Sequence, residues 1–385
     1  MGSIQASVRV GVVGLGNIAQ QHIRNLVEGH VAGAVLTATC SRSQRPEGLA
    51  TSVAHYQDYR ALVDSGVCDA IVVATPTHSH LDIGRAVLDA NLHLMMEKPM
   101  GLSIQEGESL LSRCTPSSVA ALMLNQRADP LFLRMKEIIE SSILGDLIRI
   151  NWCMTNWFRP EIYFQVSDWR ATWRGEGGGV LVNQCIHNLD ILQWLCGMPK
   201  AVRAHCQFGR FHDVEVEDDV TAYLEYENGA TGVFVGSTGE APGVNRFEVI
   251  GDAGSLVFDG SQLSLAQNMP STAMFNRTTK QMFGMPETVT DLLAIDRKVN
   301  QHAVLMQNFV NAIRDNEPLI APLAEGLRSL SIANAMLLST WKEQTIEFPI
   351  DAGEYQTHLQ TKIDRSSLRV KADVEAEINM DSSYR

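Results

Sequence analysis

The stretch VRVGVVGLGNIAQQHIRNLVE, residues 8–28, decides the fold that we expect for this chain. Its apolar first part, residues 8–13, predicts a buried strand, and residues 18–28 have the periodicity of a helix. The glycine-rich turn GLGNIA lies between them. In such a unit the first glycine permits a tight turn, the second lets a backbone approach a pyrophosphate, and a small third residue lets helix and strand pack closely. The stretch therefore predicts a dinucleotide-binding unit.

Four residues of this loop, Gly14, Gly16, Asn17 and Ile18, are the predicted cofactor contacts. Free backbone N–H groups at the start of a helix, together with the positive end of its dipole, hold phosphates without a basic side chain. A glycine turn that binds no ligand is the alternative at this point.

The first 124 residues continue this alternation of short apolar runs and amphipathic stretches. Further strands are expected at residues 35–39, 70–74, 92–96 and 119–123, and helices at 80–90 and 103–112. The pattern predicts an α/β fold whose N-terminal domain, residues 1–124, has a Rossmann-type, doubly wound parallel sheet.

The pattern changes after residue 125. Helices are expected at residues 131–140, 178–196, 304–313 and 324–341, and strands at 220–226, 231–235 and 345–349. Asn228-Gly229 is a hairpin signal between two of these strands. We therefore expect an α+β domain over residues 125–365 with a large open, mainly antiparallel sheet. Residues 366–385 are polar and are expected to form a C-terminal arm of uncertain order.

One face of such a sheet needs a cover, which a second copy commonly supplies, so a homodimer or homotetramer through the C-terminal sheet is expected. The net charge of −13, without a block of Lys or Arg, argues against nucleic acid or a membrane surface as partner. Seven cysteines without a CxxC pair favour the reducing cytoplasm. A small-molecule substrate fits these features.

Residues after the second and third strands indicate how a dinucleotide would be bound. Cys40-Ser41-Arg42-Ser43 lacks the acid that selects NAD, so Ser41 and Arg42 could bind the extra phosphate of NADP. Arg42 could equally stack on an adenine, and the choice between NAD and NADP stays open. Thr75 and Pro76 are expected beside the cofactor, although a strand followed by a turn would give the same signal.

Glu97-Lys98-Pro99 closes the strand at residues 92–96, at the sheet edge where open α/β sheets bind ligands. Proline restricts Lys98 to extended backbone angles, which gives its side chain a stiff mount. A lysine beside a cationic nicotinamide has its ammonium form disfavoured and can exchange protons near neutral pH. The plain alternative is a solvated lysine that pairs with Glu97.

The stretch Gly177 to Asp190 begins with three glycines and continues as an apolar helical segment. Asn183, His187 and Asp190 would share one face of that helix, and buried polar groups need partners. They could form a structural network. The dinucleotide loop and the strand-end lysine instead favour a proton-transfer site with His187. Asn183 is a poor zinc ligand and no second, closely spaced His or Cys is present, so no metal is expected.

A segment rich in aromatic residues and arginine precedes these glycines. Such side chains suit the apolar C–H faces and hydroxyl rim of a sugar, or they could be core or interface residues. The residues that we predict to bind substrate here are Trp157, Arg159, Tyr163, Trp169 and Arg170.

Taken together, these motifs resemble the glucose-fructose oxidoreductase, inositol dehydrogenase and MocA family. The quoted motifs are GxGxxA at residues 14–19, TPxxxH at 75–80, EKP at 97–99 and GGGxLxNQxxHxxD at 177–190. The resemblance implies a Rossmann domain followed by an open-sheet domain, NAD(P)-linked chemistry on sugar or cyclitol hydroxyls, and frequent dimers or tetramers. It implies Lys98 and His187 as catalytic residues. It also places His80, Glu97 and Lys98 at the cofactor, and Lys98, Arg127, Asn183 and His187 at the substrate.

Asn183 departs from the aspartate of many family members. It looks like the variant found in enzymes that oxidise the C3 hydroxyl of glycosides or nucleotide sugars. An amide cannot act as a base, so His187 would remove the proton while Lys98 polarises the oxygen. Two rivals remain: a glycosidase or lyase that oxidises its sugar transiently with retained NAD, and a non-catalytic nucleotide sensor.

Overall fold

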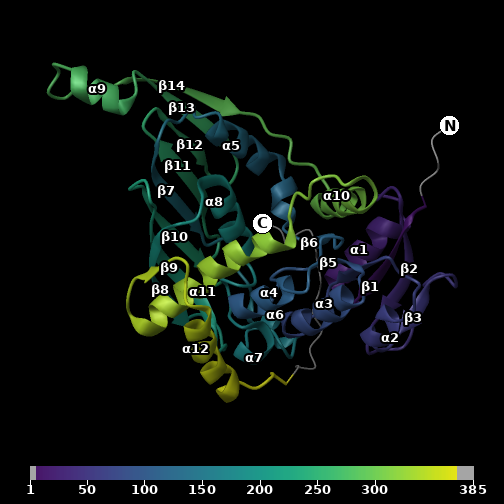
Figure 1. Cartoon of the computed structure of the whole chain (residues 1–385). Helices are drawn as coiled ribbons and strands as arrows, with labels where there is room; N and C mark the ends of the chain where they lie inside the picture. The colour runs from purple at the N-terminus through teal and green to yellow at the C-terminus, as the bar shows by residue number, and fades with distance from the viewer. Residues whose placement is uncertain (1–5, 371–385) are drawn as a thin grey trace, which may run out of the picture. The chain divides into compact units, whose positions relative to one another are not determined.

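The computed structural model describes residues 6–370, which form two compact units (Figure 1). The first unit comprises the described residues up to Ala128 together with Val299–Leu330, and the second comprises Asp129–Lys298 and the residues from Ser331 onward. Residues 299–330, which the sequence predicted for the second domain, are grouped with the first unit in the structure. The helix α10 (Gln301–Asp315) lies in that segment and packs on the first helix and first strand of the N-terminal sheet.

The first unit contains a parallel sheet of six strands in the order β3-β2-β1-β4-β5-β6. The strands are β1 (Val8–Val13), β2 (Ala34–Cys40), β3 (Ala54–Tyr56), β4 (Ala70–Val73), β5 (His93–Met96) and β6 (Ala120–Leu122). Every residue of β4 is buried, as expected of a central strand that pairs with β1 and β5 and packs against α3. The strand order reverses between β1 and β4, and open α/β sheets bind ligands at that point. The predicted Rossmann-type fold is confirmed.

The helices of the first unit are α1 (Asn17–Val27), α2 (Tyr59–Val63), α3 (His80–Asp89), α4 (Ile104–Leu111) and α10. Sequence analysis missed β3 and α2. The strand β3 is three residues long and the helix α2 is five residues long, so neither element is long enough to show a periodicity. Asp58, whose side chain accepts a hydrogen bond from the Arg60 N–H, caps α2.

The second unit contains a mixed sheet of nine strands in the order β14-β13-β12-β11-β7-β10-β9-β8-β15. The strands are β7 (Leu147–Met154), β8 (Ala201–Phe208), β9 (Glu217–Glu225), β10 (Thr231–Ser237), β11 (Asn245–Gly251), β12 (Gly254–Phe258), β13 (Leu263–Met269), β14 (Glu287–Leu293) and β15 (Ile346–Glu347). The β7–β10 pair is parallel and the other pairs are antiparallel. The hairpin predicted at Asn228-Gly229 joins β9 to β10, and the strand predicted at residues 345–349 is β15, at an edge of the sheet.

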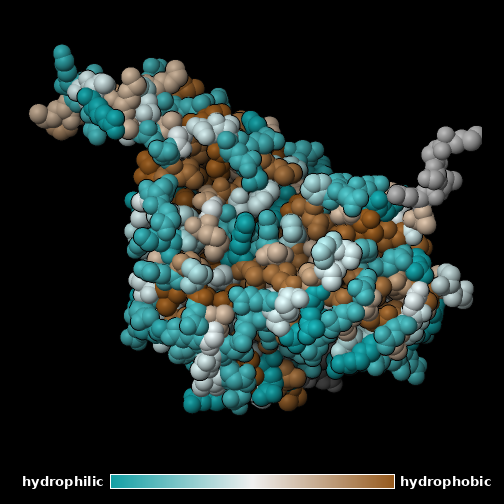
Figure 2. Space-filling model, in the orientation of Figure 1, coloured by the Kyte–Doolittle hydropathy of each residue, from teal (hydrophilic) through white to brown (hydrophobic). Residues whose placement is uncertain are grey.

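The helices of the second unit are α5 (Pro130–Glu140), α6 (Glu161–Gln165), α7 (Trp173–Glu176), α8 (Ile186–Cys196), α9 (Thr272–Thr278) and α12 (Ala352–Arg365), and α11 (Gly326–Lys342) crosses the boundary between the units. The connection that contains α9, between β13 and the edge strand β14, projects from the sheet (Figure 1), and its surface mixes apolar and polar side chains (Figure 2). Among residues 6–370, no helix is both long and apolar enough to cross a membrane.

The helix predicted over residues 178–196 begins only at Ile186. Residues 177–185 form turns instead, because two of their N–H groups, those of Gly179 and Leu181, donate to the Oε1 atom of Glu217. Ser366, the first residue of the predicted C-terminal arm, accepts hydrogen bonds from the Arg174 backbone and side chain. The rest of the predicted C-terminal arm, residues 371–385, lies outside the described residues.

Candidate active site

Gly14 closes the turn after β1, and its conformation excludes any other residue. Its φ is +102°, and an added Cβ would lie 2.2 Å from the backbone oxygen of Ala74. Its N–H donates to the Cys40 oxygen at 2.9 Å. The loop therefore passes in backbone contact with the ends of β2 and β4, as the sequence motif requires.

Gly16 is the N-cap residue of α1, and the start of this helix is suited to a phosphate. No side chain caps it, and its first turn contains no acidic residue. An added Cβ at Gly16 would meet nothing within 4 Å, so there is room beside the backbone at the start of the helix. Asn17 is exposed and Ile18 half-buried beside them. This arrangement fits the pyrophosphate of a dinucleotide, which the helix dipole would stabilise.

Ser41 and Arg42 follow β2 at the same edge of the sheet. The Ser41 hydroxyl is buried and has no hydrogen-bond partner among residues 6–370, whereas Arg42 is exposed. A hydroxyl and a mobile cation at this strand end fit a ribose and its 2′ substituent. The phosphate preference stays a prediction.

His80 is buried and connects the loops that follow β4 and β5. Its Nδ1 lies 2.7 Å from the Pro99 oxygen and its Nε2 lies 2.8 Å from the Thr75 oxygen. Burial lowers its pKa, although the hydrogen bonds to the two carbonyls oppose that effect. The predicted cofactor residue His80 thus contacts the backbone at both Thr75 and Pro99. Pro76, which is half-buried, lies in the same loop as Thr75.

Glu97 is buried, and its Oε1 lies 2.7 Å from the Nε2 of His22 on the inner face of α1. Burial would raise the Glu97 pKa, but the hydrogen bond from His22 and the nearby charges of His22, His302 and Lys98 outweigh it and lower the pKa to about 2. The His302 ring lies against His22 with 5.7 Å between centroids. Burial lowers the pKa of His302 to about 4. Glu97 is therefore a buried anion that joins the end of β5 to α1.

Lys98 is half-buried at the carboxyl end of β5. Its neighbours in sequence are fixed on both sides, Glu97 by His22 and Pro99 by His80. The backbone that carries the lysine is thus held by two buried histidines from α1 and α3.

In the second unit, His187 lies in the first turn of α8 and Asn183 in the turn before it, and both are half-buried. The predicted helical stripe from Asn183 through Asp190 is therefore wrong at its first member. The Asn183 amide nitrogen donates to a carboxylate oxygen of Glu176. Glu176 is itself buried and was not predicted from sequence.

Glu217, at the start of β9, is the second buried acid that sequence analysis missed. Its Oε1 accepts from the N–H groups of Gly179 and Leu181 at 2.8 and 3.0 Å. Burial is the largest cause that raises its pKa to about 7, and the charge of Glu176 adds to it. An added Cβ on Gly179 would lie 2.0 Å from the Glu217 backbone oxygen. The glycine loop is thus fitted to this acid and its strand.

The predicted sugar-binding aromatics form a cation–π cluster. The Arg170 guanidinium lies 4.3 Å from the Tyr163 ring centroid and 5.2 Å from that of Trp169. Arg159 lies 5.2 Å from Tyr163 and 5.3 Å from Trp157. Trp157 is buried and its N–H faces Met154 and Asn188, so it is a core residue, while the other four are half-buried.

Arg127 was predicted to bind substrate, but its placement supports a structural role. The side chain is fully buried, donates to the Ile320 oxygen at 3.1 Å and forms an ion pair with Glu325. It holds the segment before α11 against the end of β6 within the first unit.

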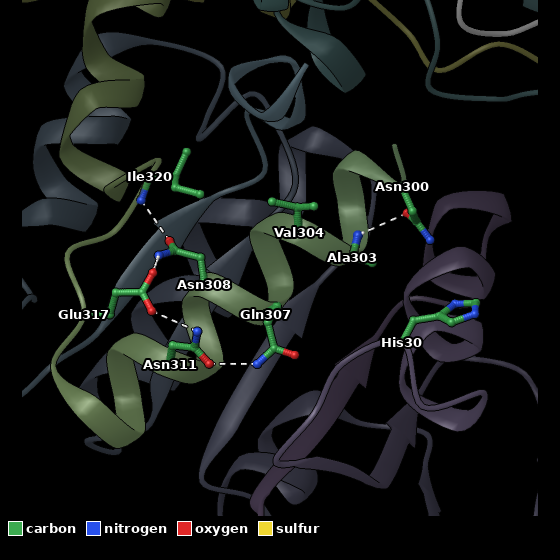
Figure 3. A pocket seen from close by; sticks show the side chains of 9 residues that line it. All are labelled: His30, Asn300, Ala303, Val304, Gln307, Asn308, Asn311, Glu317 and Ile320. Carbon is green, nitrogen blue, oxygen red and sulfur yellow. Dashed lines mark hydrogen bonds between the residues drawn. The ribbon is translucent and has the colours of Figure 1, made fainter. Parts of the chain in front are cut away.

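Figure 3 shows a hollow in the first unit that is lined by amide side chains of α10. The carboxylate of Glu317 accepts from Asn308 and Asn311 at 2.9 and 2.8 Å, and Gln307 donates to Asn311 at 2.7 Å. These side chains satisfy one another's hydrogen bonds. We therefore interpret the lining of the hollow as a structural network and do not take the hollow as a candidate site. Among residues 6–370, no three His, Cys, Asp or Glu side chains are grouped so that they could hold a metal ion.

Two family models match the chain and together cover more than half of it. Residues 8–125 match the oxidoreductase family with an NAD-binding Rossmann fold, and residues 132–257 match the GFO/IDH/MocA C-terminal domain. The chain belongs to the GFO/IDH/MocA family. It is therefore an NAD(P)-dependent oxidoreductase, and the glycine loop of its first unit fits that cofactor.

Curated relatives resemble the chain over most of its length. It is 24% identical to the NADP-dependent scyllo-inositol 2-dehydrogenase IolW of Bacillus subtilis, over 88% of this chain and 96% of the relative. It is also 24% identical to levoglucosan dehydrogenase of Pseudarthrobacter phenanthrenivorans, over 76% of this chain and 83% of the relative. Among solved structures, the WlbA dehydrogenase of Bordetella pertussis in complex with NADH and UDP-GlcNAcA is 25% identical, with a TM-score of 0.74 over 90% of this chain and 100% of that one.

Proposed function

We propose that this protein transfers a hydride between NAD(P) and a hydroxyl of a sugar, glycoside, nucleotide sugar or cyclitol. Support comes from the family, whose relatives include inositol and levoglucosan dehydrogenases, and from the motifs that hold Lys98 and His187. The observation that carries the proposal is the loop at Gly14 and Gly16, followed by a lysine whose backbone two buried histidines fix. A C3 hydroxyl is the proposed position, because Asn183 replaces the more common aspartate.

The bound nicotinamide would supply the hydride acceptor or donor. His187 would accept the hydroxyl proton, and the Lys98 ammonium would stabilise negative charge on the same oxygen. Thr75, Pro76, Ser41 and Arg42 would hold the rest of the dinucleotide. Asn183 would bind a hydroxyl, and Tyr163, Trp169, Arg159 and Arg170 would contact the ring as their partial exposure allows.

The test is a cofactor and substrate survey. Native mass spectrometry of the purified protein would report a retained dinucleotide, and scyllo-inositol, myo-inositol, levoglucosan and UDP-sugars would be supplied with NAD or NADP. We expect nicotinamide reduction with at least one substrate. Cleavage of a glycoside without accumulation of reduced cofactor would instead favour the glycosidase alternative. Binding of the dinucleotide with neither reaction would favour a sensor.

We further propose a homodimer or homotetramer through the outward face of the nine-stranded sheet, in the cytoplasm. Tyr223 and Val233 are paired neighbours on that face, and Tyr223 is 41% exposed. All seven cysteines are free. Light scattering should give two or four subunits, and Tyr223→Glu should lower that number. A monomer at micromolar concentration would contradict the proposal.

A further inference from the structure

Glu176 is a buried acid that the mechanism above does not use. It ends the short helix α7, directly before the three glycines, and it is 3% exposed. The N–H of Ala171 donates to its Oε2 at 2.7 Å, and Thr172 caps the same turn. The carboxylate is therefore held in one orientation by backbone that is itself fixed.

The other oxygen of Glu176 accepts a hydrogen bond from the Asn183 side chain. A carboxylate has no hydrogen to donate, so the Asn183 atom that faces it must be the amide nitrogen. The carbonyl Oδ1 lies on the opposite side of the same planar amide. Asn183 is half-buried as a residue, and its amide nitrogen is the atom that faces Glu176.

The surroundings explain why an amide suits this position. Glu217 and Asp218 of β9 line the same small cavity as Glu176 and Asn183. Asp218 is engaged by His212 at 3.1 Å and by the N–H groups of that loop. An aspartate at position 183 would add a further carboxylate in direct contact with Glu176, and like charges at that distance cannot both ionise cheaply.

We propose that Glu176 is a positioning residue that orients Asn183, so that the Asn183 Oδ1 accepts a hydrogen bond from a substrate hydroxyl. The inference rests on the proposed function for its substrate. Glu176 and Asn183 act as a matched pair of acceptor and donor. The family's aspartate would fit this chain only if position 176 became a donor.

A charge exchange tests the pairing. The variants are Asn183→Asp, Glu176→Gln and the double variant Glu176→Gln/Asn183→Asp, with Asn276→Asp on the exposed side of α9 as the matched control. In Asn183→Asp two carboxylates meet, whereas in the double variant the glutamine can donate to the aspartate. Thermal melting from about pH 5 to about pH 8 reads this contact without any turnover.

We expect the melting temperature of Asn183→Asp to lie below that of the parent at about pH 8. The difference between the two melting temperatures should shrink toward about pH 5, where one carboxylate becomes protonated. The double variant should close the gap, and the control should show none. With scyllo-inositol or levoglucosan, whichever the parent oxidises, kcat/KM should fall about tenfold in Asn183→Asp, mainly through KM, and recover in the double variant.

Melting and kinetics of Asn183→Asp that equal those of the parent at every pH would overturn the inference. So would a double variant no better than Asn183→Asp. Recovery of melting without recovery of KM would limit the pair to a structural role and would also overturn it. A parent that reduces no cofactor with any probe would overturn the proposed function, and the melting series would still read the pair.

Discussion

Glu97 and Glu217 are both buried glutamates, one in each unit, yet their pKa values move in opposite directions. Glu97 stands next to Lys98 and has a pKa of about 2, whereas Glu217 binds the glycine loop that precedes His187 and has a pKa of about 7. Burial opposes the charge of both. Glu97 meets the imidazole of His22, while Glu217 meets two backbone N–H groups and a second acid, Glu176.

The difference teaches that burial alone does not set the charge state of an acid. A hydrogen bond from an imidazole and nearby positive charge lower the pKa of buried Glu97, whereas burial dominates at Glu217, where backbone dipoles and another acid are the neighbours. The first unit therefore offers a buried anion that joins the end of β5 to α1. The second offers an acid whose charge can change within the working range of an enzyme.

The largest effect that we expect is on turnover, and it tests whether a residue from each unit contributes to catalysis. Lys98→Met and His187→Ala should each lower kcat by about a thousandfold, because the first removes the ammonium that stabilises charge on the reacting oxygen and the second removes the proton acceptor. Dinucleotide affinity, measured by calorimetry, should change little. Lys280→Met and His205→Ala, at exposed positions, are the matched controls. Undiminished rates in either active-site variant would remove that residue from the mechanism.

The glycines test whether both loops depend on close backbone contact. Gly14→Ala and Gly179→Ala should each destabilise the protein by about 3 kcal/mol or more, since each new Cβ would lie near 2 Å from a carbonyl oxygen. Chemical denaturation measures this loss. Gly16→Ala, whose Cβ meets nothing, should melt like the parent and bind NAD(P) more weakly. Equal stability of all three would refute the steric account.

The opposite pKa shifts predict opposite responses to pH. The Glu97 pKa is lowered, so its contribution is complete above about pH 4.5 and is lost as the pH falls toward 2. The Glu217 pKa is raised, so its contribution is complete below about pH 4.5 and is lost as the pH rises through 7. Each shift corresponds to about 3 kcal/mol.

Two substitutions check these signs. Glu97→Gln should be less stable than the parent at about pH 7, with a deficit that shrinks in acid, while Glu217→Gln should gain relative to the parent as the pH rises to about 8. Melting curves from about pH 2 to about pH 8 measure the stability of both variants relative to the parent. If the stability of both variants changed with pH in the same direction, the neighbours of Glu97 and Glu217 would not set different charge states for the two acids.

The smallest effect concerns cofactor choice. Arg42→Ala should weaken NADP binding about tenfold and NAD binding little, because the guanidinium would pair with the 2′-phosphate. Titration with each dinucleotide measures the ratio. An equal loss for both would assign Arg42 to stacking on the adenine.

Much of the fold followed from periodicity. The five strands predicted in the first sheet, the hairpin at Asn228-Gly229 and the edge strand β15 all carry strong local signals. The strand β3 and the helix α2 were missed because they are held by tertiary contacts rather than by their own pattern. The apolar run at residues 178–185 indicated a helix, but there the N–H groups of Gly179 and Leu181 donate to the Glu217 side chain instead of making helical hydrogen bonds.

The site was predicted unevenly for a similar reason. Gly14 and Lys98 stand at strand ends, which sequence locates well. Glu217 and Glu176 act through partners distant in sequence or across a turn, and the only available signal was an acidic residue directly before the glycines. Nothing local to Arg127 reveals its ion-pair partner Glu325, almost two hundred residues away, so the sequence did not indicate this structural contact.

Transfer of deuterium tests the central claim most directly. A substrate carrying deuterium on the carbon of the reacting hydroxyl would be incubated with the protein and NAD or NADP, and the recovered cofactor would be weighed by mass spectrometry. The account predicts a gain of one mass unit in the reduced cofactor, abolished in Lys98→Met and His187→Ala. Conversion of the substrate with no deuterium in the cofactor would contradict it.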